Sequence, residues 1–189
     1  RVGVSALAAN TSGSQNTAIG YQALLTNNVG ASNTAIGNRA LRVAGIANNN
    51  IAIGKDVMLV TLSGSKNVAI GNNAMESNQT GDANVCIGHY AGYDVLGSGN
   101  VLIGPADNET SADVTFRPPN ISGDRQLVIG SGGQAWITGD SNYDVTLSND
   151  LTVNANTLIK GNLVVNGTTT TVKSNICLLY TSPSPRDGL

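Results

Sequence analysis

The chain has 189 residues and a formal net charge of −2 at pH 7, and charged residues make up 12% of it. Its ten Lys and Arg residues are spread along the whole length, so no basic patch indicates a nucleic-acid-binding protein. No apolar run approaches the roughly 20 residues needed to cross a bilayer, so we predict no membrane insertion. Ile, Val, Leu and Ala recur at regular positions, which argues against a disordered chain.

Residues 1–104 contain a repeat with a period of 17 residues, shortened to 16 in its last copy. Position 0 of the repeat is the glycine that closes each Val-Gly or Ile-Gly pair. This position is occupied by Gly3, Gly20, Gly37, Gly54, Gly71, Gly88 and Gly104. Position −4 is occupied by Asn16, Asn33, Asn50, Asn67, Asn84 and Asn100. A fixed period of this kind predicts an architecture in which each copy stacks on the next.

Each copy is predicted to form one coil of a parallel β-solenoid, an all-β fold. Positions −3 to −1 indicate a short strand, because β-branched residues there flank a small residue at −2. The −2 column holds Ala four times, then Cys86 and Leu102, which is typical of a face pressed against a close neighbour. Val57–Leu62 reads as a strand in the slot after position 0, so we expect two short strands in each coil.

The glycine and asparagine columns have distinct predicted roles in the corners of the coils. Glycine at position 0 lets the chain leave the strand with a positive φ, without the steric penalty of a Cβ atom. The asparagines at position −4 are expected to form a ladder of side-chain amides from coil to coil, while each also bonds its local turn. Both columns are therefore interpreted as structural residues of the repeat.

The chain after the repeat is divided into three further segments. Residues 105–124 predict a connector loop, because the period fails and Pro118-Pro119 prevents regular pairing. Residues 125–176 predict a β-rich shaft of alternating segments separated by Gly, Asn and Asp corners. Residues 177–187 look like a translated sequencing adapter, so 177–189 is treated as a tail of non-biological origin. With a start in mid-repeat, this indicates a fragment assembled from environmental DNA.

The phrase NTAIGYQAL, repeated as NTAIGNRAL and NVAIGNNAM, resembles the repeats of phage tail-fibre and related virion appendage proteins. It is also similar to the shorter head repeats of trimeric autotransporter adhesins. Residues 125–148 and 151–175 look like the β-rich shafts of tail fibres from marine phages. The resemblance implies a homotrimer of left-handed parallel β-rolls.

The same resemblance implies a function. The chain would be a structural component of a tail fibre in the virion, forming a trimeric stalk that attaches to a host cell-surface glycan or protein and contacts other virion tail proteins. A bacterial trimeric surface adhesin, located at the cell surface, is the alternative. A carbohydrate-depolymerising tailspike is a third possibility.

No pattern in the chain predicts catalysis, a metal site or a cofactor. Cys86 has no His or second Cys placed to assist it, so it is interpreted as a packing residue. Glu76 and Asp94 lie in adjacent coils, but a glycosidase pair also needs a sugar-binding cleft, and only Tyr90 and Tyr93 supply aromatic rings nearby. We therefore predict that the protein is not an enzyme.

Candidate contact residues come from positions that vary between copies. His89, the single histidine, occupies the polar and variable +1 column, and we expect it to face solvent rather than bind a metal ion. The residues proposed for contact with a partner are Tyr21, Lys55, His89, Tyr90 and Tyr93.

Overall fold

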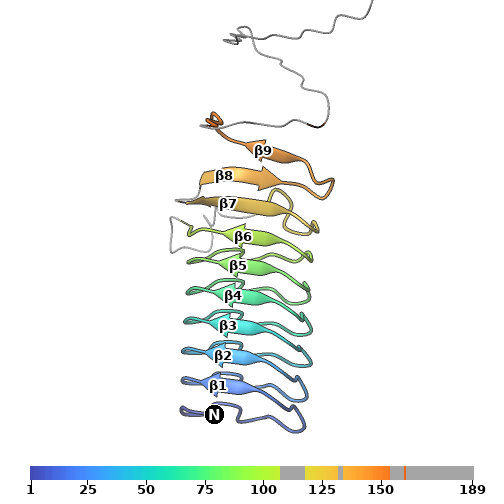
Figure 1. Cartoon of the computed structure of the whole chain (residues 1–189). Helices are drawn as coiled ribbons and strands as arrows, with labels where there is room; N and C mark the ends of the chain where they lie inside the picture. The colour runs from blue at the N-terminus through green and yellow to red at the C-terminus, as the bar shows by residue number, and fades with distance from the viewer. Residues whose placement is uncertain (107–117, 132–133, 154–159, 161–189) are drawn as a thin grey trace, which may run out of the picture. The chain divides into compact units, whose positions relative to one another are not determined.

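The computed structural model of the protein describes residues 1–106, 118–131, 134–153 and 160. The chain divides into two units, Arg1–Leu151 and Thr152–Leu189. In the first unit, the described strands form one nine-stranded sheet in sequence order (Figure 1). The strands are β1 (Thr17–Ile19), β2 (Thr34–Ile36), β3 (Ile51–Ile53), β4 (Val68–Ile70), β5 (Val85–Ile87), β6 (Val101–Ile103), β7 (Leu127–Ser131), β8 (Gln134–Gly139) and β9 (Val145–Leu147). The described residues include no helix, and hence no candidate for a membrane-spanning helix.

Strands β1 to β6 stack in parallel, with one three-residue strand in each coil (Figure 1). Each strand residue pairs with its equivalent in the next copy, as Ala18 does with Ala35 and Ala35 with Ala52. Successive coils therefore rise by about 4.8 Å, the spacing of hydrogen-bonded strands. This register confirms the predicted parallel β-solenoid of 17-residue coils.

The predicted second strand of each coil is wrong. Val57 and Met58 lie in a turn, and Val60 makes only an isolated bridge with Val43. The physical reason is the backbone at positions +2 and +4, which has a positive φ, for example 51° at Leu24 and 47° at Met58, whereas a strand requires a negative φ. These corners still stack through backbone hydrogen bonds between coils.

The hydrophobic core lies inside the coils of a single chain. The residue at position −2 points inward and is fully buried in every strand from β1 to β6. Larger side chains at position +4, such as Leu24, Leu41 and Met58, fill the same interior and are also fully buried. The close neighbour expected for the −2 column is therefore another part of the same coil.

The coil of Gly88 shows how tightly this interior is packed. Position −2 there is Cys86, which is larger than Ala, and position +4 is Gly92 instead of Leu or Met. A Cβ atom on Gly92 would lie 2.5 Å from Cys86 Sγ, well inside contact distance. A larger side chain on one wall is thus matched by the absence of a side chain on the other, as close packing requires.

The parallel stack continues beyond residue 104, where the sequence analysis ended the repeat. Strand β7 pairs in parallel with β6, placing Val128 opposite Leu102. Residues at the end of the expected connector also join the stack, since Leu96 N donates to Ile121 O at 2.8 Å. The next coil therefore resumes before residue 125.

The expected hairpins follow this coil. Strand β8 pairs antiparallel with β7, and β9 pairs antiparallel with β8. Residues 151–153, expected to begin another strand, are not in one. The later shaft strands and the adapter-like tail fall outside the described residues.

Candidate functional site

The glycines at position 0 are required by the close approach of successive coils. Their φ values lie between 129° and 138°, a region that residues with a side chain rarely adopt. A Cβ atom on Gly37 would also lie 2.1 Å from the carbonyl oxygen of Gly54 in the next coil. The glycine column is therefore set by two constraints, of which only the backbone conformation could be anticipated from the sequence.

The asparagines at position −4 join each coil to the next through backbone groups. Asn50 Oδ1 accepts a hydrogen bond from Asn67 N at 2.9 Å, and Asn67 Nδ2 donates to Gly81 O at 2.8 Å. The same pattern repeats along the column, whose members from Asn33 onward are fully buried. The ladder thus consists mainly of hydrogen bonds from asparagine side chains to backbone groups. The turn to which each side-chain amide donates belongs to the following coil.

The ladder extends into the coil that contains β7. Gln126 takes the place of asparagine there, and its backbone N donates to Asn100 Oδ1 at 2.9 Å. Its side-chain Nε2 donates to Asn120 O at 2.6 Å. A longer amide side chain therefore closes the column at the point where the spacing of the repeat changes.

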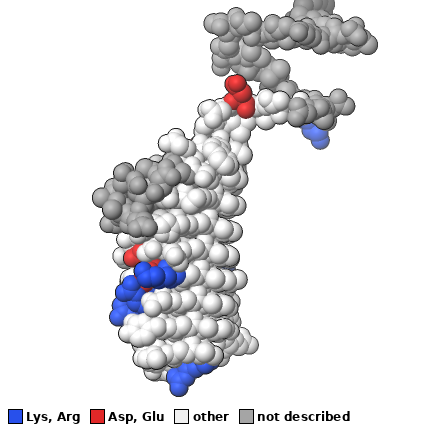
Figure 2. All heavy atoms as spheres, turned by 90° about the vertical axis from the view of Figure 1, so that its left-hand side faces the viewer, with Lys and Arg blue, Asp and Glu red and all other residues white. Residues whose placement is uncertain are grey.

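Three of the proposed contact residues line one pocket at the corner that follows the strands. The pocket has a volume of about 250 Å³ and is lined by Lys55, Asn72, Asn73, His89 and Tyr90. Figure 2 views the side of the solenoid at which β1 to β6 end, and charged side chains gather there mainly part-way along the stack. The pocket residues come from positions +1 and +2 of successive coils.

The other two proposed contact residues differ in their relation to the pocket. Tyr93 packs against Tyr90, with 5.6 Å between the ring centroids, and His89 meets Tyr90 edge-on at 4.6 Å. Tyr21 is exposed at the same corner but lies two coils before Lys55 and does not line the pocket. The structure therefore brings four of the five residues together.

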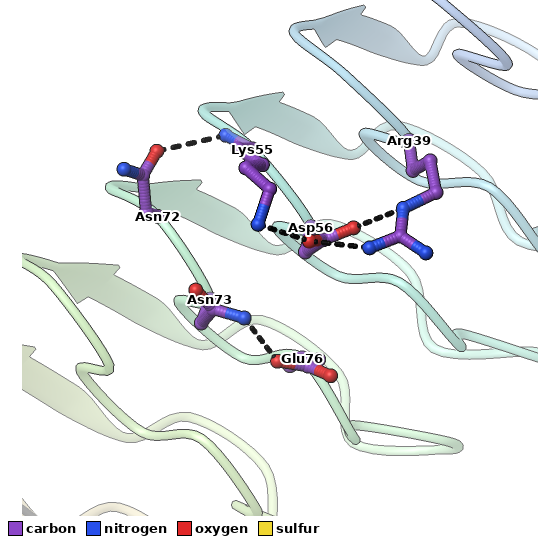
Figure 3. A network of polar contacts seen from close by, with 6 residues as sticks. All are labelled: Arg39, Lys55, Asp56, Asn72, Asn73 and Glu76. Atoms are coloured by element: carbon purple, nitrogen blue, oxygen red, sulfur yellow. Dashed lines mark hydrogen bonds and ion pairs between the residues drawn. The ribbon is translucent and has the colours of Figure 1, made fainter. Parts of the chain in front are cut away.

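A buried carboxylate, that of Asp56, pairs with the lysine of the pocket (Figure 3). Asp56 is 3% exposed and forms a bidentate pair with Arg39, at 2.6 Å from Nε to Oδ1 and 2.7 Å from Nη2 to Oδ2. Lys55 Nζ lies 3.0 Å from Asp56 Oδ2. Burial alone would raise the pKa of Asp56, but the hydrogen bonds from Arg39 and Lys55 outweigh it and hold the pKa below its ordinary value.

In each of the two pocket asparagines, one atom of the side-chain amide forms a hydrogen bond with the protein (Figure 3). Asn72 Oδ1 accepts a hydrogen bond from Lys55 N at 2.9 Å. Asn73 Nδ2 donates to Glu76 Oε2. Among the described residues, no protein partner is seen for Asn72 Nδ2 or Asn73 Oδ1, so the pocket offers one amide donor and one amide acceptor.

Sequence reasoning missed Asn72 and Asn73 as pocket residues. An asparagine beside a corner glycine reads as a turn residue, and these two therefore stood out less than the aromatic and charged residues. The available signal was their position, since they occupy the same +1 and +2 columns as Lys55 and Tyr90 in adjacent coils.

A second hollow, of about 210 Å³, lies beside the β8–β9 hairpin and is lined by Pro119, Thr138, Gly139, Asp140, Asp144 and Thr146. Asp140 Oδ1 accepts hydrogen bonds from Asn142 N at 2.9 Å and Asp144 N at 3.2 Å. This carboxylate therefore stabilises the turn. Within the described part of the chain, no group of three or more His, Cys, Asp or Glu side chains is arranged to hold a metal ion.

The thiol of Cys86 is not arranged as a nucleophile. It is fully buried in the core, and burial raises its pKa. A thiol in such surroundings stays protonated at neutral pH, whereas the thiolate is the reactive form.

Comparisons of the chain with known protein families, curated proteins and solved structures found no match. The function must therefore be inferred from the residues and their arrangement.

Proposed function

We propose that the protein is a structural component of a phage tail fibre or a similar virion appendage, forming a trimeric stalk for host-cell attachment. The observation that supports this most is an apolar strip on the outward face of the sheet. Together with the resemblance of the NTAIG repeats to appendage proteins, the strip favours a rod built from several copies of the chain.

The strip is formed by the column at position −1 and its continuation. Ile19 and Ile103, at either end of the β1–β6 stack, are 42% and 39% exposed. Ile129 lies opposite Ile137, and Ile137 lies opposite Leu147, so β7 to β9 continue the same face. Eight strand spacings of about 4.8 Å give a strip roughly 38 Å long. Ile36, Ile53 and Ile70, between these ends, are half-buried. The strip is thus a partly exposed apolar column, and contiguous exposed apolar surface marks an interaction site.

A second copy of the chain is the partner that fits this strip. The facing surface must present apolar side chains with the same rise of about 4.8 Å along its length, which another copy does. The −2 and +4 columns are already buried inside each chain, so the outward columns are what association would cover. Closed symmetry is the usual arrangement for identical copies, and the resemblance favours three.

The remaining features suit a stalk. Backbone hydrogen bonds and the asparagine ladder connect every coil to the next, which favours stiffness along the stack. The polar pocket lies at the corner after the strands, whereas the strip lies on the strands themselves. One surface would therefore serve assembly while another remains for attachment.

Sedimentation equilibrium tests the assembly. We expect a particle of about three times the 19.2 kDa chain mass. Replacing Ile53 and Ile70 with Lys should dissociate it while the circular dichroism spectrum of the β-solenoid is retained. Leu62→Lys is the matched control, because Leu62 is 47% exposed but lies outside the strip. A wild-type monomer, or equal dissociation by the control, would contradict the proposed interface.

Binding to bacteria tests the attachment role. The labelled assembly should bind cells from a panel of bacterial strains and reduce phage adsorption to the strains that it labels. Incubation with bacterial polysaccharide should release no new reducing ends, and release would instead favour a depolymerising tailspike. Failure to label any strain that adsorbs phage carrying these repeats would overturn the attachment role.

A further inference from the structure

We infer that the pocket lined by Lys55, Asn72, Asn73, His89 and Tyr90 binds an acidic sugar residue, one that carries a carboxylate beside its hydroxyl groups. The inference rests on the proposed attachment function and names the chemistry of the ligand. It is drawn from the size of the pocket, its amide groups, its aromatic rings and its charge.

The pocket has room for a single sugar ring. Its volume of about 250 Å³ falls just below the range of about 300–1,000 Å³ typical of sites for drug-sized ligands. Lys55 and His89 occupy the same column two coils apart, which corresponds to roughly 10 Å at the strand spacing of about 4.8 Å. A terminal or side-branch residue of a glycan therefore fits better than an extended chain.

The amide groups of the pocket match adjacent hydroxyl groups. Lys55 N fixes the orientation of Asn72 by donating to its Oδ1, and Glu76 fixes that of Asn73 by accepting from its Nδ2. Within the part of the chain that the structure describes, the opposite ends of the two amides, a donor and an acceptor, are left for a ligand. A sugar hydroxyl both donates and accepts, so neighbouring hydroxyls on one ring satisfy both groups.

The aromatic ring of Tyr90 forms part of the pocket lining. The ring of Tyr90 contacts both His89 and Tyr93, with 4.6 Å and 5.6 Å between ring centroids. Ring packing of this kind limits the movement of Tyr90 before a ligand arrives, which lowers the cost of ordering on binding. Tyr90 lies in the pocket lining, where an aromatic ring can pack against the C–H face of a sugar.

The charge of the pocket favours an anionic ligand. Among the described residues, its lining contains one lysine and no carboxylate. Lys55 directs Nζ to Asp56 at 3.0 Å, but an ammonium group has three donors, so others remain for a ligand. Because Arg39 Nη2 also donates to Asp56 Oδ2 at 2.7 Å, the carboxylate does not depend on Lys55 alone. A ligand carboxylate would gain a charge-assisted hydrogen bond from Nζ.

Saturation-transfer NMR with simple glycosides tests the inference. The probes are the methyl glycosides of glucuronic, galacturonic and N-acetylneuraminic acid, with methyl glucoside and methyl galactoside as neutral counterparts. At least one acidic glycoside should bind, and the neutral ones should bind at least about tenfold more weakly, as expected for loss of a charged hydrogen bond. Equal binding of neutral and acidic glycosides would overturn the assignment of an acidic ligand.

Matched variants locate the binding. Lys55→Met and Asn72→Ala should each weaken the acidic glycoside about tenfold or more, with unchanged circular dichroism spectra. Lys66→Met removes an equal charge from an exposed position before strand β4, whereas Lys55 follows strand β3. This variant should leave binding unchanged. Equal loss in all three variants, or loss in none, would show that the ligand binds elsewhere or is attracted only by general charge.

The same variants separate this inference from the proposed function. If Lys55→Met labels bacteria as well as the wild type does, attachment stands and the pocket is not the attachment site. If the wild type binds no glycoside but labels bacteria, the ligand class is wrong while attachment remains. If it binds neither glycosides nor bacteria, both proposals fall.

Discussion

Replacing Gly37 with Ala should destabilise the solenoid by about 3 kcal/mol. The φ of Gly37 is 136°, and holding a residue with a side chain in such a region costs about 1–3 kcal/mol. The new Cβ would lie 2.1 Å from Gly54 O, and relieving an overpacked contact costs a further 1–3 kcal/mol or so. Reduced flexibility of the unfolded chain returns about 0.4–1 kcal/mol. In a thermal melt at fixed protein concentration, the midpoint should fall by roughly 6–12 °C.

Gly99→Ala is the control for this prediction. Gly99 also has a positive φ, 72°, but a Cβ atom there would meet nothing closer than Arg125 Cγ at 3.4 Å. Ala83 already occupies the equivalent position in the previous coil, with a φ of 56°. We expect a loss below about 1 kcal/mol, the usual range for a change without a named clash. If the two variants melt at the same temperature, the close approach of coils is not what requires glycine at position 0.

Three further outcomes follow from buried groups. Asn67→Ala should cost about 2–4 kcal/mol in urea unfolding, because a buried donor and a buried acceptor of the next coil lose their partner. The fold favours the ionised form of Asp56, so this residue stabilises the protein above about pH 4, and the stabilisation is lost as pH falls through the lowered pKa. Asp56→Asn should therefore weaken the pH dependence of the melting midpoint in this range. In a Cys177→Ser background, Cys86 should react with a thiol reagent only after unfolding, because the fold buries it.

The features that could be predicted from the sequence are those that recur in every coil. Glycine at position 0 and asparagine at position −4 each answer a local requirement that is met again in the next copy. The in-register pairing of β1 to β6 follows, because equivalent residues must lie one above another when the period is constant. The constant period therefore allowed both the fold class and the strand register to be predicted from the sequence.

The features that could not be predicted depend on contacts between copies or on breaks in the period. The strand expected at Val57–Leu62 was inferred from β propensity, which the left-handed corner overrides. The coil of β7 was hidden because Gln126 replaces the asparagine and follows Asn100 by 26 residues instead of 17. The pocket could not be predicted because residues such as Lys55 and His89 are distant in sequence and line one pocket only when the coils stack.

The corner that carries the pocket can vary in sequence because backbone hydrogen bonds stack it from coil to coil. Side-chain contacts between coils, such as Asn72 Oδ1 with Lys55 N and Arg39 with Asp56, add to this stacking at particular coils. At position +2, Arg39 N donates to Tyr21 O at 2.8 Å, and Tyr90 N donates to Asn72 O at 3.0 Å, although the side chains of the two coils differ completely. Backbone groups hold this corner together, whereas positions −2 and 0 are restricted by packing and by the next coil. A change of an exposed side chain at +1 or +2 therefore alters the surface while these backbone hydrogen bonds remain, whereas buried Asp56 also pairs with the adjacent coil. Such an arrangement allows a stalk to acquire a new ligand pocket by exchanging residues at one corner, while the columns that fold the chain and the strip that faces its copies stay the same.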